Sequence, residues 1–373
     1  MRPQGTEPVL HIGPLVRISA QGFPIPSVGS QEADQEGTEV NDRAVELLEQ
    51  YDIEVLRTRK GRGAIVCDTN QGCLIFKEYS GSQDRIELQD RVLRQVAEAG
   101  LVRVEAIIPA REGSLFVKDM DGTAYVLKTW QEGRECGVHE REECLEAVRL
   151  LARLHGSMEL PADTPNIPVA FSPEKEYDKH NKELKRVRKY LRQKGQKSWF
   201  ETSLRKAFDP FLEQALAVTE EWREYCLDPG QPGAGDKDSV SLCHGDYQYH
   251  NILLGPRGWF VVNFEKCMCD DPIRDLYLLL RKLLEKGNWS VPLGEELLAA
   301  YEKERPISAR SWIDLYYRLA YPEKFWKIVN FYYNSGKAWI PGKNQEKLER
   351  VIEQEKEKQH FLDQVFRNVK GRR

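Results

Sequence analysis

The segment from Ser241 to Leu254 limits the possible folds of this chain more than any other part of the sequence. Apolar residues lead into the triplet His244-Gly245-Asp246, and an apolar run resumes after Asn251. This pattern predicts a strand that enters, a polar loop, and a strand that leaves. An ordinary polar turn between two strands is the simplest alternative, and the residue types within the loop argue against it.

The loop carries the groups that phosphoryl transfer requires. We assign Asp246 as the base that orients and deprotonates an attacking hydroxyl, and Asn251 as an amide ligand of a magnesium ion. The spacing of five residues between them is that of a kinase catalytic loop. His244 is placed in the same catalytic group, as a member of the loop that packs and forms hydrogen bonds.

A second strand, from Trp259 to Glu265, is expected about a dozen residues further on. In kinases an aspartate after such a strand chelates the metal. Asn263 stands at that position, and a neutral amide holds magnesium less well than a carboxylate does. Glu265 would lie on the same face of an extended strand and is the candidate replacement; the alternative is a solvated or structural carboxylate.

The first part of the chain predicts a small sheet with one main helix. The helix is expected from Asp84 to Ala99, with an apolar stripe along one face and Gly100 as its stop. The expected strands are Ile53–Thr58, Ala64–Asp68, Cys73–Tyr79, Leu115–Asp119 and Ala124–Thr129.

This order of elements suggests a nucleotide-binding lobe. Lys77, on the third strand, is expected to reach nucleotide phosphates and to pair with Glu87, or failing that with Glu98, on the helix. The alternative is an ordinary surface lysine. The backbone between Leu127 and Trp130 is expected to meet the adenine ring. The Gly-containing stretch 60–63 would lie over the phosphates, although it lacks a complete glycine-rich motif.

The chain after Glu135 is expected to be mainly helical. Asp275 begins one of these helices and is predicted to be a buried acceptor that fixes the backbone of the catalytic loop. The predicted division is a loosely ordered arm over 1–41, a nucleotide-binding lobe over 42–128, and a helical lobe over 129–373 with a charged helix at its end.

Length and composition limit the class of protein. A chain of 373 residues is long enough for two lobes. The formal net charge of −4 argues against a dedicated nucleic-acid binder, and no run of about 18 apolar residues predicts a membrane span. The 8 scattered cysteines are typical of a protein made in the cytoplasm with reduced thiols, not of a disulfide scaffold.

Four stretches carry a resemblance to a known family: Trp130–Cys136, Leu242–Leu253, Arg274–Tyr277 and Leu280–Lys282. Over residues 42–360 the chain resembles the aminoglycoside phosphotransferase and choline kinase-like superfamily, and within it the CotS family of bacterial spore-coat proteins. The resemblance implies an α+β, bilobal protein kinase-like fold with a small antiparallel-sheet N-lobe and a larger helical C-lobe. It also implies ATP and Mg²⁺ as cofactors, deposition in the spore coat, and coat proteins as partners. Asn263 departs from the family's aspartate.

Three functional hypotheses follow. The first is a kinase that transfers the γ-phosphoryl group of ATP to a hydroxyl acceptor of unknown identity. The second is a pseudokinase that kept the fold and serves as a structural component of the spore coat. The third, a small-molecule kinase acting on an aminoglycoside or a choline-like compound, has the least support in the sequence. Asn263 separates the first two, because weak metal binding impairs a kinase and not a structural protein.

Overall fold

The computed structural model describes residues 45–61, 63–158, 169, 173–228, 241–334 and 342–370. The expected N-terminal arm lies outside these residues. The chain divides into two units, Met1–Glu46 and Leu47–Arg373. The second unit contains both expected lobes.

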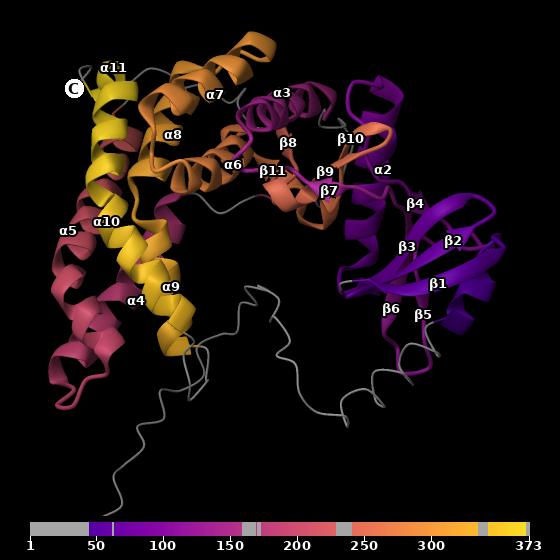
Figure 1. Ribbon diagram of the computed structural model, residues 1–373, viewed down its shortest axis with the longest axis horizontal. Coiled ribbons are helices and arrows are strands. Elements are labelled where there is room, and N and C mark those ends of the chain that lie inside the picture. The colour runs from indigo at the N-terminus through magenta and orange to yellow at the C-terminus, as the bar shows by residue number, and fades with distance from the viewer. Residues whose placement is uncertain are drawn as a thin grey trace, which may run out of the picture. The chain divides into compact units, whose positions relative to one another are not determined.

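An antiparallel sheet occupies the first part of this unit (Figure 1). Its strands run in the order β1-β2-β3-β6-β4, and β5 also pairs with β6. A short 3₁₀ helix, η1, precedes the sheet. The bounds are η1 Leu47–Gln50, β1 Val55–Gly61, β2 Ala64–Thr69, β3 Gly72–Tyr79, β4 Ile107–Ile108, β5 Val117–Lys118 and β6 Ala124–Thr129.

Helix α2, Gln83–Ala99, follows β3 and has defined signals at both ends. The Ser82 side chain accepts a hydrogen bond from the backbone N–H of Arg85, and Gly100 ends the helix in the left-handed conformation at φ 67°. One face is buried and is formed by Ile86, Leu88, Gln89, Val92, Leu93 and Val96. The helix and its stop therefore match the sequence prediction.

Short strands and 3₁₀ helices frame the polar loop. Strand β8 pairs with β11, and β9 pairs with both β10 and β7, all antiparallel. The loop 244–251 thus runs from a strand of one small sheet to a strand of another. The bounds are β7 Arg134–Glu135, β8 Ser241–Cys243, η2 Tyr249–Asn251, β9 Ile252–Gly255, β10 Gly258–Val261, η3 Phe264–Lys266 and β11 Met268–Asp270.

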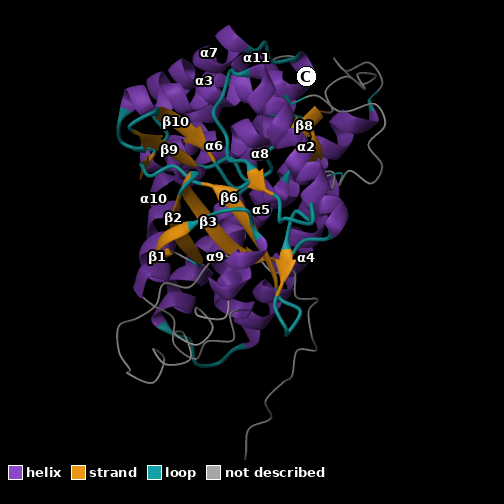
Figure 2. Ribbon diagram, turned by 90° about the vertical axis from the view of Figure 1, so that its right-hand side faces the viewer, coloured by secondary structure: helices purple, strands orange, loops and turns teal. Residues whose placement is uncertain are grey.

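Helices make up most of the remaining chain (Figure 2). No helix among the described residues is long and apolar enough to cross a membrane. All 8 cysteines are free thiols. The helices are α3 Arg141–Ser157, α4 Pro173–Gln193, α5 Trp199–Leu227, α6 Ile273–Lys286, α7 Val291–Glu304, α8 Ala309–Ala320, α9 Glu323–Asn334, α10 Gly342–Val365 and α11 Arg367–Lys370.

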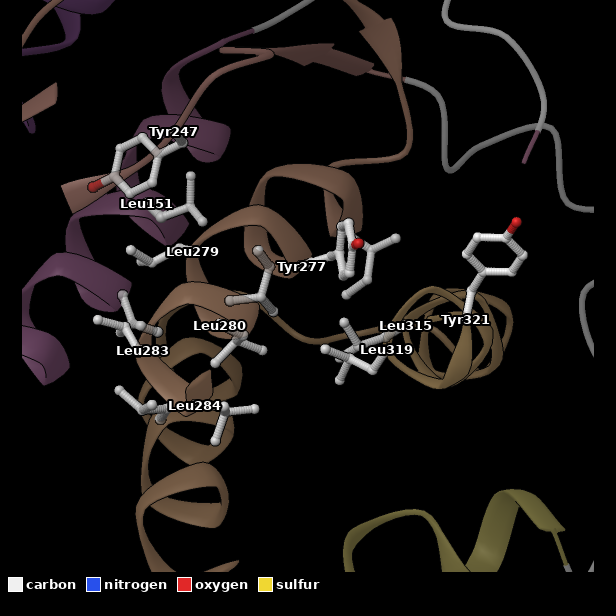
Figure 3. Packing of buried hydrophobic residues seen from close by; sticks show 14 of the residues in the cluster. Leu151, Tyr247, Tyr277, Leu279, Leu280, Leu283, Leu284, Leu315, Leu319 and Tyr321 are labelled. Atoms are coloured by element: carbon white, nitrogen blue, oxygen red, sulfur yellow. The ribbon is translucent and has the colours of Figure 1, made fainter. Parts of the chain in front are cut away.

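The polar loop is anchored in this helical core by Tyr247, whose side chain is fully buried. Figure 3 shows its ring close to Leu151 of α3 and Leu279 of α6. The phenol hydroxyl donates a hydrogen bond to the carbonyl of Ala147 at 2.9 Å. A buried aromatic ring with a satisfied hydroxyl fixes the loop to the helices behind it.

The predicted α+β fold is confirmed, with an antiparallel sheet followed by a mainly helical part. Strands β4 and β7 were missed because two residues are too few to show a periodicity. The strand predicted from Trp259 to Glu265 is wrong in its second half: β10 ends at Val261, and Asn263 turns the chain at φ 69° into η3. Asn263 and Glu265 are therefore not related by the alternation of a strand.

Candidate active site

Asp275, in the first turn of α6, holds the backbone of the polar loop. Its carboxylate accepts the N–H of His244 at 2.6 Å and the N–H of Gly245 at 2.9 Å. The third partner is the His155 ring, at 3.3 Å. Burial alone would raise the pKa of Asp275, but the histidines and these hydrogen bonds outweigh burial and hold that pKa below its usual value. The aspartate has the position that the sequence predicts, and it touches no group that would react.

His244 is fully buried and completes the loop's internal bonding. Its Nε2 lies 3.0 Å from the carbonyl of Val262, and its Nδ1 lies 3.2 Å from the backbone nitrogen of Asp246. These partners require Nε2 to donate and Nδ1 to accept, which is one tautomer of a neutral imidazole. The histidine therefore fastens the loop to the segment that carries Asn263.

Gly245 allows the loop to pass close to its neighbour. Its φ is 78°, and a Cβ added there would lie 2.0 Å from the carbonyl oxygen of Lys266. No side chain fits this gap without moving backbone.

We expect Gly245→Ala to lower the free energy of unfolding by more than the roughly 1 kcal/mol of a strained positive φ, because the clash with Lys266 adds to the strain. Gly113→Ala is the matched control, since Gly113 has φ 85° and open space around it. Chemical denaturation of both variants gives the comparison; equal losses would show that the loop can shift away from Lys266.

Asp246, the expected base, accepts one hydrogen bond on each carboxylate oxygen. Oδ2 lies 2.9 Å from the ammonium of Lys266. Oδ1 accepts a hydrogen bond from the side-chain amide of Gln248. Both donors stabilise the carboxylate and would make it a weaker base toward an attacking hydroxyl.

The two asparagines expected to bind metal are hydrogen-bonded to each other. Asn251 donates through Nδ2 to the carbonyl of Asp246 at 2.8 Å, which turns its Oδ1 toward Asn263. Nδ2 of Asn263 donates to that oxygen at 2.7 Å. Oδ1 of Asn263 accepts from the ammonium of Lys77 at 2.9 Å. Both amide oxygens at the expected metal position are therefore occupied by donors of the chain itself.

Glu265 lies between two lysines. Its Oε1 is 2.5 Å from the ammonium of Lys77 and 2.7 Å from that of Lys128. Lys128 is also 3.0 Å from the carboxylate of Glu105, and the side chains of Lys128 and Glu105 are 0% and 2% exposed. Burial opposes charge on Glu265, but the two ammoniums outweigh burial and hold its pKa well below the usual value.

Glu105 contacts these charged side chains because the segment around Glu105 pairs with β10. Val104 forms a parallel bridge with Val261, next to the turn at Asn263. Oε1 of Glu105 then accepts the backbone N–H of Asn263 at 3.0 Å and that of Phe264 at 3.2 Å. The left-handed turn is therefore held by a buried carboxylate.

Arg85 of α2 holds the same segment from its other end. Its guanidinium donates to the carbonyl of Glu265 at 2.6 Å and to that of Cys267 at 2.5 Å. The chain from Asn263 to Cys267 is thus fixed at both ends by charged side chains from the first lobe.

The partner predicted for Lys77 is not the one found. Lys77 contacts Asn263 and Glu265, whereas Glu87 is exposed and accepts a hydrogen bond from Gln83. Glu98 is exposed as well. Both glutamates therefore lie on the exposed face of α2. The sequence alone could not show which residue of the second lobe would pair with Lys77 instead.

The adenine contact predicted between Leu127 and Trp130 is only in part available. Leu127 lies within β6, with strand partners on both sides, and the backbone N–H of Trp130 donates to Cys73. The Trp130 side chain packs against a small apolar cluster of Leu253, Phe260 and Val262. Apolar surface of this kind beside the lobe connection suits a purine ring.

Sequence reasoning missed Lys128, Glu105, Arg85 and Lys266. A signal existed for Lys128, which is a single charge inside an apolar strand and therefore predicts a buried partner. The sequence around the other three gave no comparable signal.

The residues at the expected metal position fit a magnesium ion poorly. Magnesium in proteins is usually held through one or two carboxylates. Here Asn251 and Asn263 are neutral, and Glu265 is paired with two ammoniums. No cluster of three or more histidine, cysteine or acidic residues that would hold a metal occurs in the part of the chain that the structure describes.

Comparison with known families decides the relationship. The family model described as "Spore coat putative kinase YutH" matches residues 44–365. The chain belongs to this family of spore-coat kinase-like proteins. The match covers nearly all of the unit that contains both lobes, including the loop 244–251 and the segment with Asn263. The predicted relationship to spore-coat proteins is thereby confirmed.

One known coat protein is similar to part of this chain, and solved structures are similar to most of it. Spore coat protein S of Bacillus subtilis (strain 168) is 31% identical over 119 residues, which is 31% of this chain and only about a third, 34%, of that protein. An aminoglycoside phosphotransferase from Alicyclobacillus acidocaldarius subsp. acidocaldarius DSM 446 superposes with a TM-score of 0.75 at 17% identity, covering 94% of this chain and 99% of the other. The spectinomycin phosphotransferase APH(9)-Ia, in complex with ADP and spectinomycin, gives 0.59 at 15% identity, covering 84% and 93%. These structures establish the fold.

Proposed function

We propose that this chain is a nucleotide-binding pseudokinase of the spore coat, which retains the phosphotransferase fold and transfers phosphate poorly or not at all. The observation that carries the proposal is the Asn263 side chain, whose two amide atoms are bonded to Lys77 and Asn251 where a kinase holds a metal. Phosphoryl transfer relies on metal ions to neutralise developing charge. A site in which the nearby carboxylate of Glu265 is already paired with two ammoniums loses that contribution.

The state of Asp246 supports the same proposal. The carboxylate of the expected base is stabilised by donors from Lys266 and Gln248, which weakens it as a proton acceptor. The family name and the partial match to spore coat protein S support a place in the coat, after synthesis in the cytoplasm of the sporulating cell and beside other coat proteins.

Three features support the proposed nucleotide binding. Lys77 lies on β3, where a kinase-like fold presents a lysine to phosphates. Trp130 and its apolar cluster provide a surface for a base. A protein of similar fold was solved with ADP. ATP is therefore the nucleotide to test.

Thermal denaturation with ATP tests this proposal. ATP at a hundredfold excess over its dissociation constant should add about 2.7 kcal/mol to the free energy of unfolding. Lys77→Ala should lose most of this gain, because the phosphates lose their ammonium. Lys118→Ala, which removes an exposed lysine on β5, is the control and should keep the gain. No ATP effect on the wild-type protein would refute nucleotide binding.

An active kinase remains the second candidate because Asp246 and Asn251 keep the spacing of a catalytic loop. An active kinase would turn over ATP with a hydroxyl acceptor at roughly 1–100 s⁻¹, the usual range of kinases. Asp246→Ala would abolish this turnover. We expect turnover at least a thousandfold below this range, unchanged by that substitution. Turnover that depends on Asp246 would make the protein an enzyme.

A further inference from the structure

We propose that lysine ammoniums take the place of a divalent cation in this site, so that the chain excludes Mg²⁺ and binds nucleotide phosphates without it. This inference concerns the site of the proposed nucleotide binding. Only its second part, the binding of phosphates without Mg²⁺, rests on that proposed function. The exclusion of the cation follows from the side chains alone.

The orientation of the two asparagines is fixed by their partners. If the Asn263 amide were flipped, its carbonyl would face the carbonyl of Asn251, and its NH₂ group would face the ammonium of Lys77. Both contacts would be repulsive, because neither pair would contain both a donor and an acceptor. Asn251 is oriented in turn by the carbonyl of Asp246. In the only consistent arrangement, each amide oxygen already accepts a hydrogen bond from the chain, and the oxygen of Asn263 faces an ammonium.

The charges beside these amides are balanced within the protein. Lys128 and Glu105 are buried, and separating them would leave an unpaired charge away from water. Glu265 and Lys77 are more accessible, with side chains 28% and 20% exposed. The accessible end of the cluster therefore carries a carboxylate that already has two ammonium partners. A divalent cation that approached Glu265 would be repelled by the ammonium of Lys77. That ammonium lies 2.9 Å from Oδ1 of Asn263 and 2.5 Å from Oε1 of Glu265.

The backbone prevents an easy rearrangement. Asn263 has a left-handed conformation, and the N–H groups of Asn263 and Phe264 are both held by Glu105. Arg85 fixes the carbonyls of Glu265 and Cys267. The ammonium of Lys77 has three N–H donors, two of which are directed to Asn263 and Glu265. A phosphate oxygen would accept the third.

Two measurements test the inference. The first titrates Mn²⁺, without nucleotide, into wild type, Asn263→Asp and Asn70→Asp, and follows free Mn²⁺ by electron paramagnetic resonance. Asn70→Asp adds the same charge at the exposed β2–β3 turn and is the matched control. We expect binding at this site to Asn263→Asp, at least tenfold tighter than any binding to the other two proteins.

The second measurement titrates ATP into the wild type by calorimetry with excess Mg²⁺ or with EDTA. We expect dissociation constants that agree within about threefold, whereas Asn263→Asp should bind ATP at least tenfold more tightly with Mg²⁺. Three outcomes would overturn the inference. The wild type could bind Mn²⁺ as tightly as Asn263→Asp does, or all three proteins could bind Mn²⁺ equally. The wild type could also lose ATP affinity tenfold in EDTA. If the wild type binds no ATP in either buffer, the proposed function fails, and the Mn²⁺ titration still decides whether the site excludes the cation.

Discussion

Lys128→Met should lower the free energy of unfolding by about 3–5 kcal/mol, because it leaves two carboxylates near each other without their shared ammonium. Burial by itself would lower the pKa of Lys128, but Glu105 and Glu265 outweigh burial and raise that pKa. The lysine is therefore charged in the folded protein. Urea denaturation at neutral pH measures the loss.

Two further variants separate charge from packing. Lys118→Met removes an exposed lysine from the same sheet and should change the free energy of unfolding by less than about 0.5 kcal/mol. Adding Glu105→Gln to Lys128→Met removes one of the unpaired anions, and the double variant should be more stable than Lys128→Met alone. A double variant no more stable than Lys128→Met alone would show that the unpaired charge of Glu105 is not what destabilises the single variant.

Asp275→Asn should lower the free energy of unfolding by about 3 kcal/mol. A carboxylate accepts both loop N–H groups, whereas an amide offers one acceptor and turns its NH₂ group toward the other buried N–H. The loop that carries Asp246 would lose one of its anchors. Asp84→Asn, in the exposed first turn of α2, is the control and should have a small effect.

The loss in Asp275→Asn should depend on pH in a defined direction. The pKa of Asp275 is lower in the folded protein than the roughly 3.9 of an unfolded chain. The carboxylate therefore stabilises the fold above that pH, and this stabilisation is lost as the pH falls through the folded pKa. The difference between wild type and variant should be constant near neutrality and should shrink below about pH 4. A difference independent of pH would point to packing instead of charge.

Local patterns were enough to predict much of the fold. The periodicity of α2 lies within the helix and its end signals lie directly beside it, and β3 alternates buried residues with more exposed ones. The spacing of Asp246 and Asn251 could be read directly because both lie in one short loop. These features depend on neighbours in the sequence, which is why the sequence was sufficient.

The partners within the site depend on contacts between distant segments. Lys77 is 186 residues from Asn263, and Lys128 is 137 residues from Glu265. Glu87 was the natural choice for Lys77 because it lies on the next helix, but that face of α2 is exposed. The turn at Asn263 was missed because its left-handed conformation is held by Glu105, whose position comes from pairing with β10.

Arg85 gives helix α2 a mechanical role. One guanidinium joins the helix to two carbonyls of the segment that follows Asn263. If α2 tilted away from the second lobe, it would either pull that segment along or break two charge-assisted hydrogen bonds. A displacement of α2 would therefore be passed to the backbone at Glu265, although the hydrogen-bond partners of the Asn251 and Asn263 side chains lie outside the helix.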